Sequence, residues 1–301
     1  MSAPLPEVVL GGVPVAPPAG GARRAGASTW RAYRRQPLGM AALVLLGLLV
    51  LVAVAGPWVV PAPASYGTDV LVAPGAGYLF GTDALGRDVL AEVVHGTRQS
   101  VLVAAAASAI AIVVGTLVAV VGAYVPWLDA VVSVVVDLTL SLPVLPLMIL
   151  VAALAGPSTT TLVLVVAAFS WPEVTRLVRS QALTVVGLAY VDAARLMTRD
   201  HAWIIGRHVV PAVTPVIVVS VVVTASRAVL SAAGLAFLGL GDPTSWSWGR
   251  ILYEAQSAGA MVSAWWLTLF PSLAILALVL SATLVSIAYN DARNPRTAGP
   301  A

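Results

Sequence analysis

The sequence predicts an all-α polytopic membrane protein with six transmembrane helices. Of its 301 residues, 59% are hydrophobic and only 10% are charged, whereas soluble domains carry about 25% charged residues. The apolar residues gather in long runs with few or no charges, and about 20 such residues in a helix cross a bilayer. All 16 basic residues are arginine, and their distribution along the chain indicates the side on which each loop lies.

The N-terminal part is expected to be a tail followed by a membrane anchor. Residues 1–36 are rich in Pro, Gly and Ala and carry five arginines, which predicts a mostly disordered basic tail. Residues 37–60 form the first predicted transmembrane helix. The alternative is a signal peptide cleaved at Ala62-Pro63-Ala64. The apolar core of a signal peptide has about 7–15 residues, fewer than Leu38–Val60, so a retained anchor is favoured.

The rest of the chain is expected to form an outer segment, a five-helix core and a tail. Residues 61–98 are polar and are predicted to be extracytoplasmic, and residues 290–301 form a polar tail. Residues 99–289 form the core, with a loop at 180–208 that overlaps a polar island, Tyr190–Pro211. The spans expected in the core are Gln99–Leu128, Ala130–Leu154, Thr159–Trp171 ending near Glu173, Val209–Leu240 and Trp265–Tyr289.

The arginines predict the topology. Six spans place both termini on one side of the membrane. That side carries twelve arginines in the N-terminal tail, the island region and the C-terminal tail, and the other side carries only Arg87, Arg98 and Arg250. Positive residues concentrate on the cytoplasmic side, so both termini and the island are predicted to be cytoplasmic.

Missing residue types exclude several kinds of chemistry. The chain has no cysteine, so it has no disulfide and no cysteine metal site. It has no lysine either, which excludes a phosphate-binding GxxxxGK[ST] loop and thus an ATP site of that kind in this chain. The net charge of +3 is too small and scattered to indicate a nucleic-acid partner. The histidines lie at loops, so no haem or metal site is predicted in the membrane: His95, His201 and His208.

The polar island has the pattern of two short helices with a bend between them. Asp192 and Arg195 are spaced i,i+3, and small or apolar residues between and after them form a strip on one side. Asp200 is placed to cap a second helix through the backbone of Trp203. Such a face is typical of a docking surface for a partner protein, and a solvated loop with ordinary cytoplasmic arginines is the alternative.

The segment Gly81–Asp88 has the composition of a structured turn. Asp88 can cap a helix over Val89–His95, and Gly96 is expected to close that helix before the second span. Glycines and capping residues shape the backbone, so a scaffold role is favoured over direct contact with a substrate. Two charges fall inside spans and are candidate pathway or intramembrane residues, Asp137 and Arg227. Asp137 is expected to make a structural hydrogen bond. Arg227 is expected to face a pathway, pair with a partner subunit or extend to the interface.

Four blocks occur in the order typical of one transporter family. Gly81-Thr82-Asp83-Ala84-Leu85-Gly86-Arg87-Asp88 with Gly96-Thr97-Arg98-Gln99-Ser100-Val101-Leu102 looks like GTDxLGRD…GxRxSL. Leu235–Gly241 with Trp248-Gly249 looks like LSFLGLG…WG, and Asp291–Pro295 looks like RDxxDP. The island, from Asp192-Ala193-Ala194 to Val210-Pro211, resembles the EAA loop. Together these blocks resemble permease subunits of the dipeptide, oligopeptide and nickel ABC importer family over residues 34–296.

The resemblance implies a type I ABC importer permease fold in which the island is the cytoplasmic coupling helix. The residues implied to contact the ATPase are Asp192, Ala193, Ala194, Arg195, Leu196, Thr198, Ile204, Arg207 and Pro211. The residues implied to form the outer structural motif are Gly81, Thr82, Asp83, Gly86, Arg87, Asp88, Gly96 and Arg98. Thr198 stands where the family has glycine. A β-branched residue resists positive φ, so either the bend lies elsewhere or the docking geometry differs.

The resemblance also implies partners and cargo. They are a second homologous permease, two ATP-binding subunits that hold ATP and magnesium, and an extracytoplasmic binding protein, assembled in the lipid of a bacterial cell membrane. The chain itself is expected to have no catalytic residue, cofactor or metal. The expected cargo is di- or oligopeptides, with nickel or another small solute as the alternative. An ion-coupled secondary transporter is the alternative of a different class, but it needs several intramembrane carboxylates.

Overall fold

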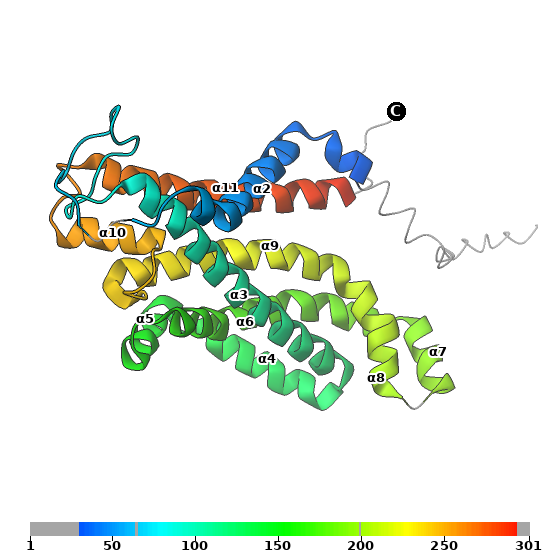
Figure 1. The fold of residues 1–301 in the computed structure, drawn as a ribbon. Coiled ribbons are helices and arrows are strands. Elements are labelled where there is room, and N and C mark those ends of the chain that lie inside the picture. The colour runs from blue at the N-terminus through cyan, green and yellow to red at the C-terminus, as the bar shows by residue number, and fades with distance from the viewer. Residues whose placement is uncertain (1–29, 64–65, 199, 294–301) are drawn as a thin grey trace, which may run out of the picture.

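The computed structural model describes residues 30–63, 66–198 and 200–293, which are mostly helical (Figure 1). Within these residues, five helices are long and apolar enough to cross a membrane, and a sixth span exists if one bent pair is counted as a single span. The predicted all-α polytopic fold is confirmed. The expected disordered tail lies outside the described residues except at its end, where residues 30–34 are helical. There the Tyr33 hydroxyl donates to the Gly39 carbonyl at 2.9 Å.

Helix α2 (Pro37–Val59) is the first span and lies beside α11 (Trp265–Arg293). Pro37 occupies the first turn of α2, where its missing N–H costs no hydrogen bond. Helix α11 continues four residues beyond the predicted end of the last span, because Asn290–Arg293 remain helical. The last residues of the chain, 294–301, lie outside the described residues.

Helix α3 (Val89–Tyr124) is one continuous element of 36 residues, about 54 Å long. Asp88 caps it, accepting a hydrogen bond from the Leu90 amide at 2.9 Å. The expected helix end at Gly96 is wrong. A Cβ at Gly96 would lie 3.2 Å from the Trp248 ring, so this glycine gives room for a neighbouring helix instead of closing its own. At Gly115 a Cβ would lie 2.7 Å from Val174 of α6 (Thr159–Val186), which shows how closely these two helices pack.

The expected third span is two helices rather than one. Helices α4 (Pro126–Ser141) and α5 (Val144–Ala155) meet at an angle of 86°. Pro143 causes the break, because proline lacks the N–H that a helix needs and disfavours helical geometry in the residue before it. Leu142 accordingly has an extended backbone, with φ −80° and ψ 149°.

Helix α6 is much longer than the predicted fourth span and continues through Pro172 to Val186. It leads into α7 (Ala189–Met197) and α8 (His201–Ile204), followed by the π-helix η2 (Ile205–Val209) and α9 (Val210–Leu235). After the π-helix η3 (Ala236–Leu240) comes α10 (Trp248–Ser257). Figure 1 shows α10 and the segment 61–88 at one end of the bundle and α7 with α8 at the other. The described chain ends lie toward the α7–α8 end.

Candidate functional site

Helix α7 packs one side against the bundle and leaves its C-terminal apolar residues exposed. Val191 and Ala194 are buried, and their i,i+3 spacing places them on one face. Leu196 and Met197 are exposed at 90% and 87% of their full surface. Leu196 and Met197 therefore give the end of α7 an apolar surface that its own chain does not cover.

The two short helices are tethered to the end of α3 through Tyr124. The Tyr124 hydroxyl and His201 Nδ1 form a hydrogen bond of 2.9 Å. The guanidinium of Arg195 lies over the Tyr124 ring at 4.8 Å and pairs with Asp192 at 3.0 Å. α7 and α8 are thus both attached to the same residue of α3.

The bend between α7 and α8 is made without a glycine. Thr198 has φ −145° and ψ 149°, an extended geometry that a β-branched residue adopts readily. Its hydroxyl accepts a hydrogen bond from the Asp200 amide at 3.1 Å. The Asp200 carboxylate accepts from the Trp203 amide at 3.0 Å, which is the predicted cap. Positive φ is therefore not needed at Thr198, and the bend is formed by hydrogen bonds of Thr198 and Asp200.

A hollow of about 560 Å³ opens between α7 on one side and α8 with η2 on the other. His208 lies there with the rings of Trp203 and Tyr190, at centroid distances of 5.3 and 6.0 Å. Ala193, Ala194, Met197, Thr198 and Asp200 complete its lining. This hollow lies beside the exposed Leu196 and Met197, so the apolar surface of the loop is concave as well as exposed.

The other residues of the loop that were expected to contact a partner differ in their exposure. Ile204 is completely buried and packs α8 on the bundle, so it is not available to a partner. Arg207 in η2 is exposed, and Pro211 is exposed in the first turn of α9. A buried Ile204 is explained by its position in a core cluster with Val178, Val209 and Val213.

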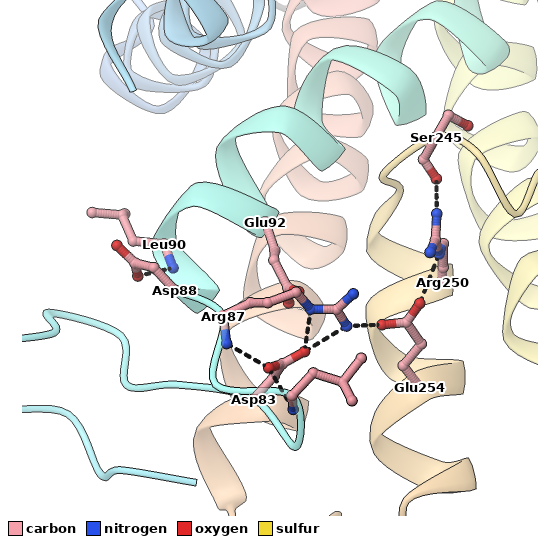
Figure 2. Close-up of polar contacts among 9 residues, drawn as sticks. Asp83, Arg87, Asp88, Leu90, Glu92, Ser245, Arg250 and Glu254 are labelled. Carbon is pink, nitrogen blue, oxygen red and sulfur yellow. Dashed lines mark hydrogen bonds and ion pairs between the residues drawn. The ribbon is translucent and has the colours of Figure 1, made fainter. Parts of the chain in front are cut away.

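At the opposite end, Arg87 is the centre of a buried ion-pair network (Figure 2). Its guanidinium contacts the carboxylates of Asp83, Glu92 and Glu254. Arg87 and Asp83 are each 6% exposed, and Glu92 is 1% exposed. Burial lowers the pKa of Arg87, but the nearby carboxylates of Glu92, Asp83 and Glu254 outweigh this effect and raise it. The network joins the outer segment, α3 and α10.

A second arginine and an indole extend the network. The guanidinium groups of Arg87 and Arg250 lie 4.6 and 4.5 Å from the Trp246 ring. Arg250 also pairs with Glu254 at 2.8 Å. Sequence reasoning found Asp83 and Arg87 but missed Glu92, Glu254 and Trp246. Glu92 carried a signal, since it is a charged residue in the first turn of the helix that Asp88 caps.

The turn before α3 is formed by two glycines with positive φ and a buried threonine. Gly81 and Gly86 have φ of 76° and 74°, and a Cβ at Gly86 would lie 2.6 Å from Gly67. Thr82 is fully buried, and its carbonyl accepts a hydrogen bond from the Trp266 indole at 3.0 Å. These contacts fix the backbone of the turn that leads into α3. Arg98, by contrast, is exposed on α3, and no ion pair within the described residues includes it.

Asp242 joins two segments at the same end. Its carboxylate accepts hydrogen bonds from the Thr244 hydroxyl at 2.6 Å and from the Thr159 hydroxyl at 2.7 Å. Hydrogen bonds from Thr244 and then Thr159 lower the pKa of Asp242 to about 2, although burial opposes them. The carboxylate is therefore ionised at neutral pH and connects the start of α6 to the loop before α10.

The two intramembrane charges have different surroundings. Asp137 is exposed on α4, and the described residues include no hydrogen bond or ion pair for it, so the expected structural hydrogen bond is not present. Arg227 forms an ion pair with Glu173 of α6, a partner from its own chain. Sequence reasoning placed Glu173 at the end of a span, because α6 was expected to end there.

The bundle of spans, with a buried ion-pair network at one end and an exposed two-helix loop at the other, defines a multi-pass membrane protein. Residues 111–299 match the family described as "Binding-protein-dependent transport system inner membrane component". Residues 26–74 match the N-terminal transmembrane domain of oligopeptide transport permease C.

Proteins named as peptide or glutathione transport system permeases are similar to this chain over most of its length. A protein of Brucella suis biovar 1, whose name describes a peptide transport system permease, is 33% identical over 258 residues, which cover 84% of this chain and 86% of that protein. The glutathione transport system permease protein GsiD of Pectobacterium atrosepticum is 33% identical over 272 residues, or 89% and 90% of the two chains. GsiD of Escherichia coli is 32% identical over 275 residues, or 90% of each.

The chain belongs to the family of binding-protein-dependent transport system inner membrane components. It is a permease component of an ABC importer of the peptide-transport family and not a catalytic subunit. A system of this kind includes ATPase and binding-protein partners.

Proposed function

We propose that this chain moves di- or oligopeptides across the membrane by alternating access, and that α7 and α8 couple it to a partner ATPase. The exposure of Leu196 and Met197 beside an open hollow carries this proposal. A helix pair with this surface, fixed to α3 by Tyr124, can transmit movement of a partner to the spans.

The remaining parts of the assembly follow from the family and from the arrangement of the chain. A second homologous permease completes the pathway, and two ATP-binding subunits hold ATP and magnesium. An extracytoplasmic protein delivers the cargo. The described chain ends lie toward the α7–α8 end (Figure 1), in agreement with cytoplasmic termini and a cytoplasmic loop.

Peptides are the favoured cargo because similar proteins are named as peptide and glutathione transport permeases. Nickel or another small solute is the competing cargo. Uptake of a labelled dipeptide and of ⁶³Ni²⁺ by cells that express the complete importer distinguishes the two. ATP-dependent dipeptide uptake supports the peptide assignment, and uptake of nickel alone contradicts it.

The coupling assignment is tested with Leu196→Asp. A carboxylate in a buried apolar contact loses the burial energy of leucine, about 1.5–3 kcal/mol, and adds the cost of desolvating a charge. We expect co-purification with the ATP-binding subunit and ATP-driven uptake to fall at least about tenfold.

The matched control is Val262→Asp at the other end of the bundle. Val262 is 95% exposed, so it has the exposure of Leu196 without its position. It should leave co-purification with the ATP-binding subunit unchanged. The proposal is wrong if Leu196→Asp co-purifies and transports like the wild type, or if the wild-type chain never associates with an ATP-binding subunit.

A further inference from the structure

An exposed ion pair lies near the middle of the bundle. Arg227 of α9 pairs with Glu173 of α6, and their side chains are 58% and 43% exposed. At 1.5 Å per residue, about 20 Å of helix separates Glu173 from each end of α6. By the same measure, Arg227 lies about 25 Å from Val210 and about 20 Å from Leu240. Arg227 therefore lies well inside the apolar run Val209–Leu240 that contains α9, and Glu173 lies just after the apolar run Thr159–Trp171 of α6.

Lipid is a poor environment for this pair. Charged side chains at mid-depth are costly in hydrocarbon and face either the protein interior or a water-filled cavity. Within this chain the pair is not buried, so water or another protein chain must cover it in the assembled permease. Opposite charges on two different helices also leave no net charge at this position when the pair is closed.

The two sides of α9 differ in character. Val222, Ala225 and Val229 line an apolar hollow of about 630 Å³ that α2, α3 and α11 complete. Arg227 is two residues from Ala225, which places it about 200° around the helix, on the opposite side. This apolar hollow is compatible with lipid or with another apolar helix, whereas the side that carries Arg227 is not.

Two small residues, Ser231 and Gly234, lie on the side of α9 that carries Arg227, together with the exposed Leu230 at i+3. Arg227, Ser231 and Gly234 are spaced i, i+4 and i+7, which places them on one face. A Cβ added at Gly234 would contact nothing within 4 Å, so the space beside it is open. We call Glu173, Arg227, Ser231 and Gly234 the mid-bundle polar face.

We propose that the mid-bundle polar face lines the aqueous pathway and that Glu173 and Arg227 bind the two terminal charges of a passing peptide. This inference rests on the proposed function as a peptide permease. The Glu173 carboxylate would accept hydrogen bonds from the terminal ammonium, and the Arg227 guanidinium would donate to the terminal carboxylate. The peptide is a zwitterion, so the ion pair between Glu173 and Arg227 is replaced by two ion pairs with the peptide. No charge is left without a partner.

The exposure of the pair suits passage rather than tight binding. Exposed ion pairs are weak because water screens them and because ordering two long side chains has an entropic cost. The Glu173–Arg227 pair therefore opens easily and closes again when the peptide leaves. The alternative is that the second permease packs against this face and excludes water. In that case a water-soluble reagent would not reach the face.

Accessibility is measured with single cysteines in the complete complex. The chain has no cysteine, so Ser231→Cys adds one thiol that a mass shift of this subunit reports. Thiols react as thiolates, which form in water and not in apolar surroundings. We expect a sulfonated maleimide to label Ser231→Cys at least about tenfold faster than Ala225→Cys in one nucleotide state. Equal, slow labelling of both in every nucleotide state overturns the pathway assignment.

Charge recognition is measured as protection of that thiol, in detergent and without the binding protein. Alanyl-alanine should slow the labelling of Ser231→Cys several-fold, whereas N-acetyl-alanyl-alaninamide, which lacks both charges, should not. Adding Glu173→Gln or Arg227→Gln should remove the protection while labelling without peptide stays fast, which shows that the variants are assembled. Equal protection by both peptides, no protection, or protection that survives both substitutions overturns the zwitterion assignment.

The outcomes separate this inference from the proposed function. If the wild-type complex performs ATP-driven dipeptide uptake but Ser231→Cys is neither labelled nor protected, only the pathway site is wrong. If Ser231→Cys is labelled and protected by alanyl-alanine but uptake does not depend on ATP, the site stands and the coupled function fails.

Discussion

The two ends of the bundle differ in which residues they bury: one buries charged residues, and the other leaves apolar residues exposed. At the α10 end, Arg87 is 6% exposed and contacts three carboxylates of its own chain. At the α7 end, Leu196 and Met197 are 90% and 87% exposed. The first end is completed by contacts within the chain, and the second presents a surface that its own chain does not cover. A stability defect is therefore expected from changes at the first end, and an assembly defect from changes at the second.

The largest effect is expected from Arg87→Met. Without the guanidinium, the carboxylates of Asp83, Glu92 and Glu254 stay close together with their main counter-charge removed. Breaking a buried pair by removing one partner costs about 3–5 kcal/mol. We expect a strongly lowered thermal midpoint, or loss of the folded subunit, in size-exclusion melting experiments on the detergent-solubilised protein.

The control for Arg87→Met is Arg98→Met. Arg98 belongs to the same sequence motif but is exposed, and exposed substitutions usually change stability by less than about 0.5 kcal/mol. Equal midpoints for the two variants would show that the buried network does not hold the α10 end together.

An intermediate effect is expected from Gly249→Ala in α10. A Cβ at Gly249 would lie 2.4 Å from the Ala233 carbonyl oxygen and 2.8 Å from Ala236 Cβ, so the backbone must shift. Overpacking of this kind costs about 1–3 kcal/mol. Gly47→Ala in α2 is the matched control because nothing lies within 4 Å of the added methyl group. It should be neutral or slightly stabilising, and a greater loss of thermal stability in Gly47→Ala than in Gly249→Ala would contradict this packing.

The smallest effect is expected from Thr198→Gly at the α7 end. Because Thr198 has an extended backbone, glycine offers no conformational gain and loses less than about 1 kcal/mol through its greater freedom when unfolded. Uptake should stay within about twofold of the wild type. A several-fold increase in uptake would instead show that the working loop adopts positive φ at this position, where the family has glycine.

Local signals correctly predicted the capping residues and the two short helices of the loop. Asp88 and Asp200 cap helices as their positions indicated, because a side-chain cap depends on residues only two or three positions away. The apolar runs predicted the spans for the same reason, since bilayer thickness acts on each run separately. Helical spacing also predicted an apolar strip on the loop, and the structure leaves Leu196 and Met197 exposed there.

Contacts between distant segments could not be read from the sequence. Glu254 is 167 positions from Arg87, and Glu173 is 54 positions from Arg227. Gly96 has the composition of a helix end, but its role is set by Trp248, which approaches from α10. The break at Pro143 was visible in the sequence, yet the apolar run on both sides of it favoured a single span.

Helix α3 gives the molecule a mechanical property that none of its local contacts reveals. Its first turn adjoins the Arg87 network, and its last residue, Tyr124, is bonded to the loop that we propose moves with the ATPase. A rod about 54 Å long that tilts by about 5° moves its far end by about 5 Å. Arg87 joins the first turn of α3 to α10, and Gly115 packs against α6, so we expect a displacement of Tyr124 to tilt α3 and α6 together about the Arg87 end.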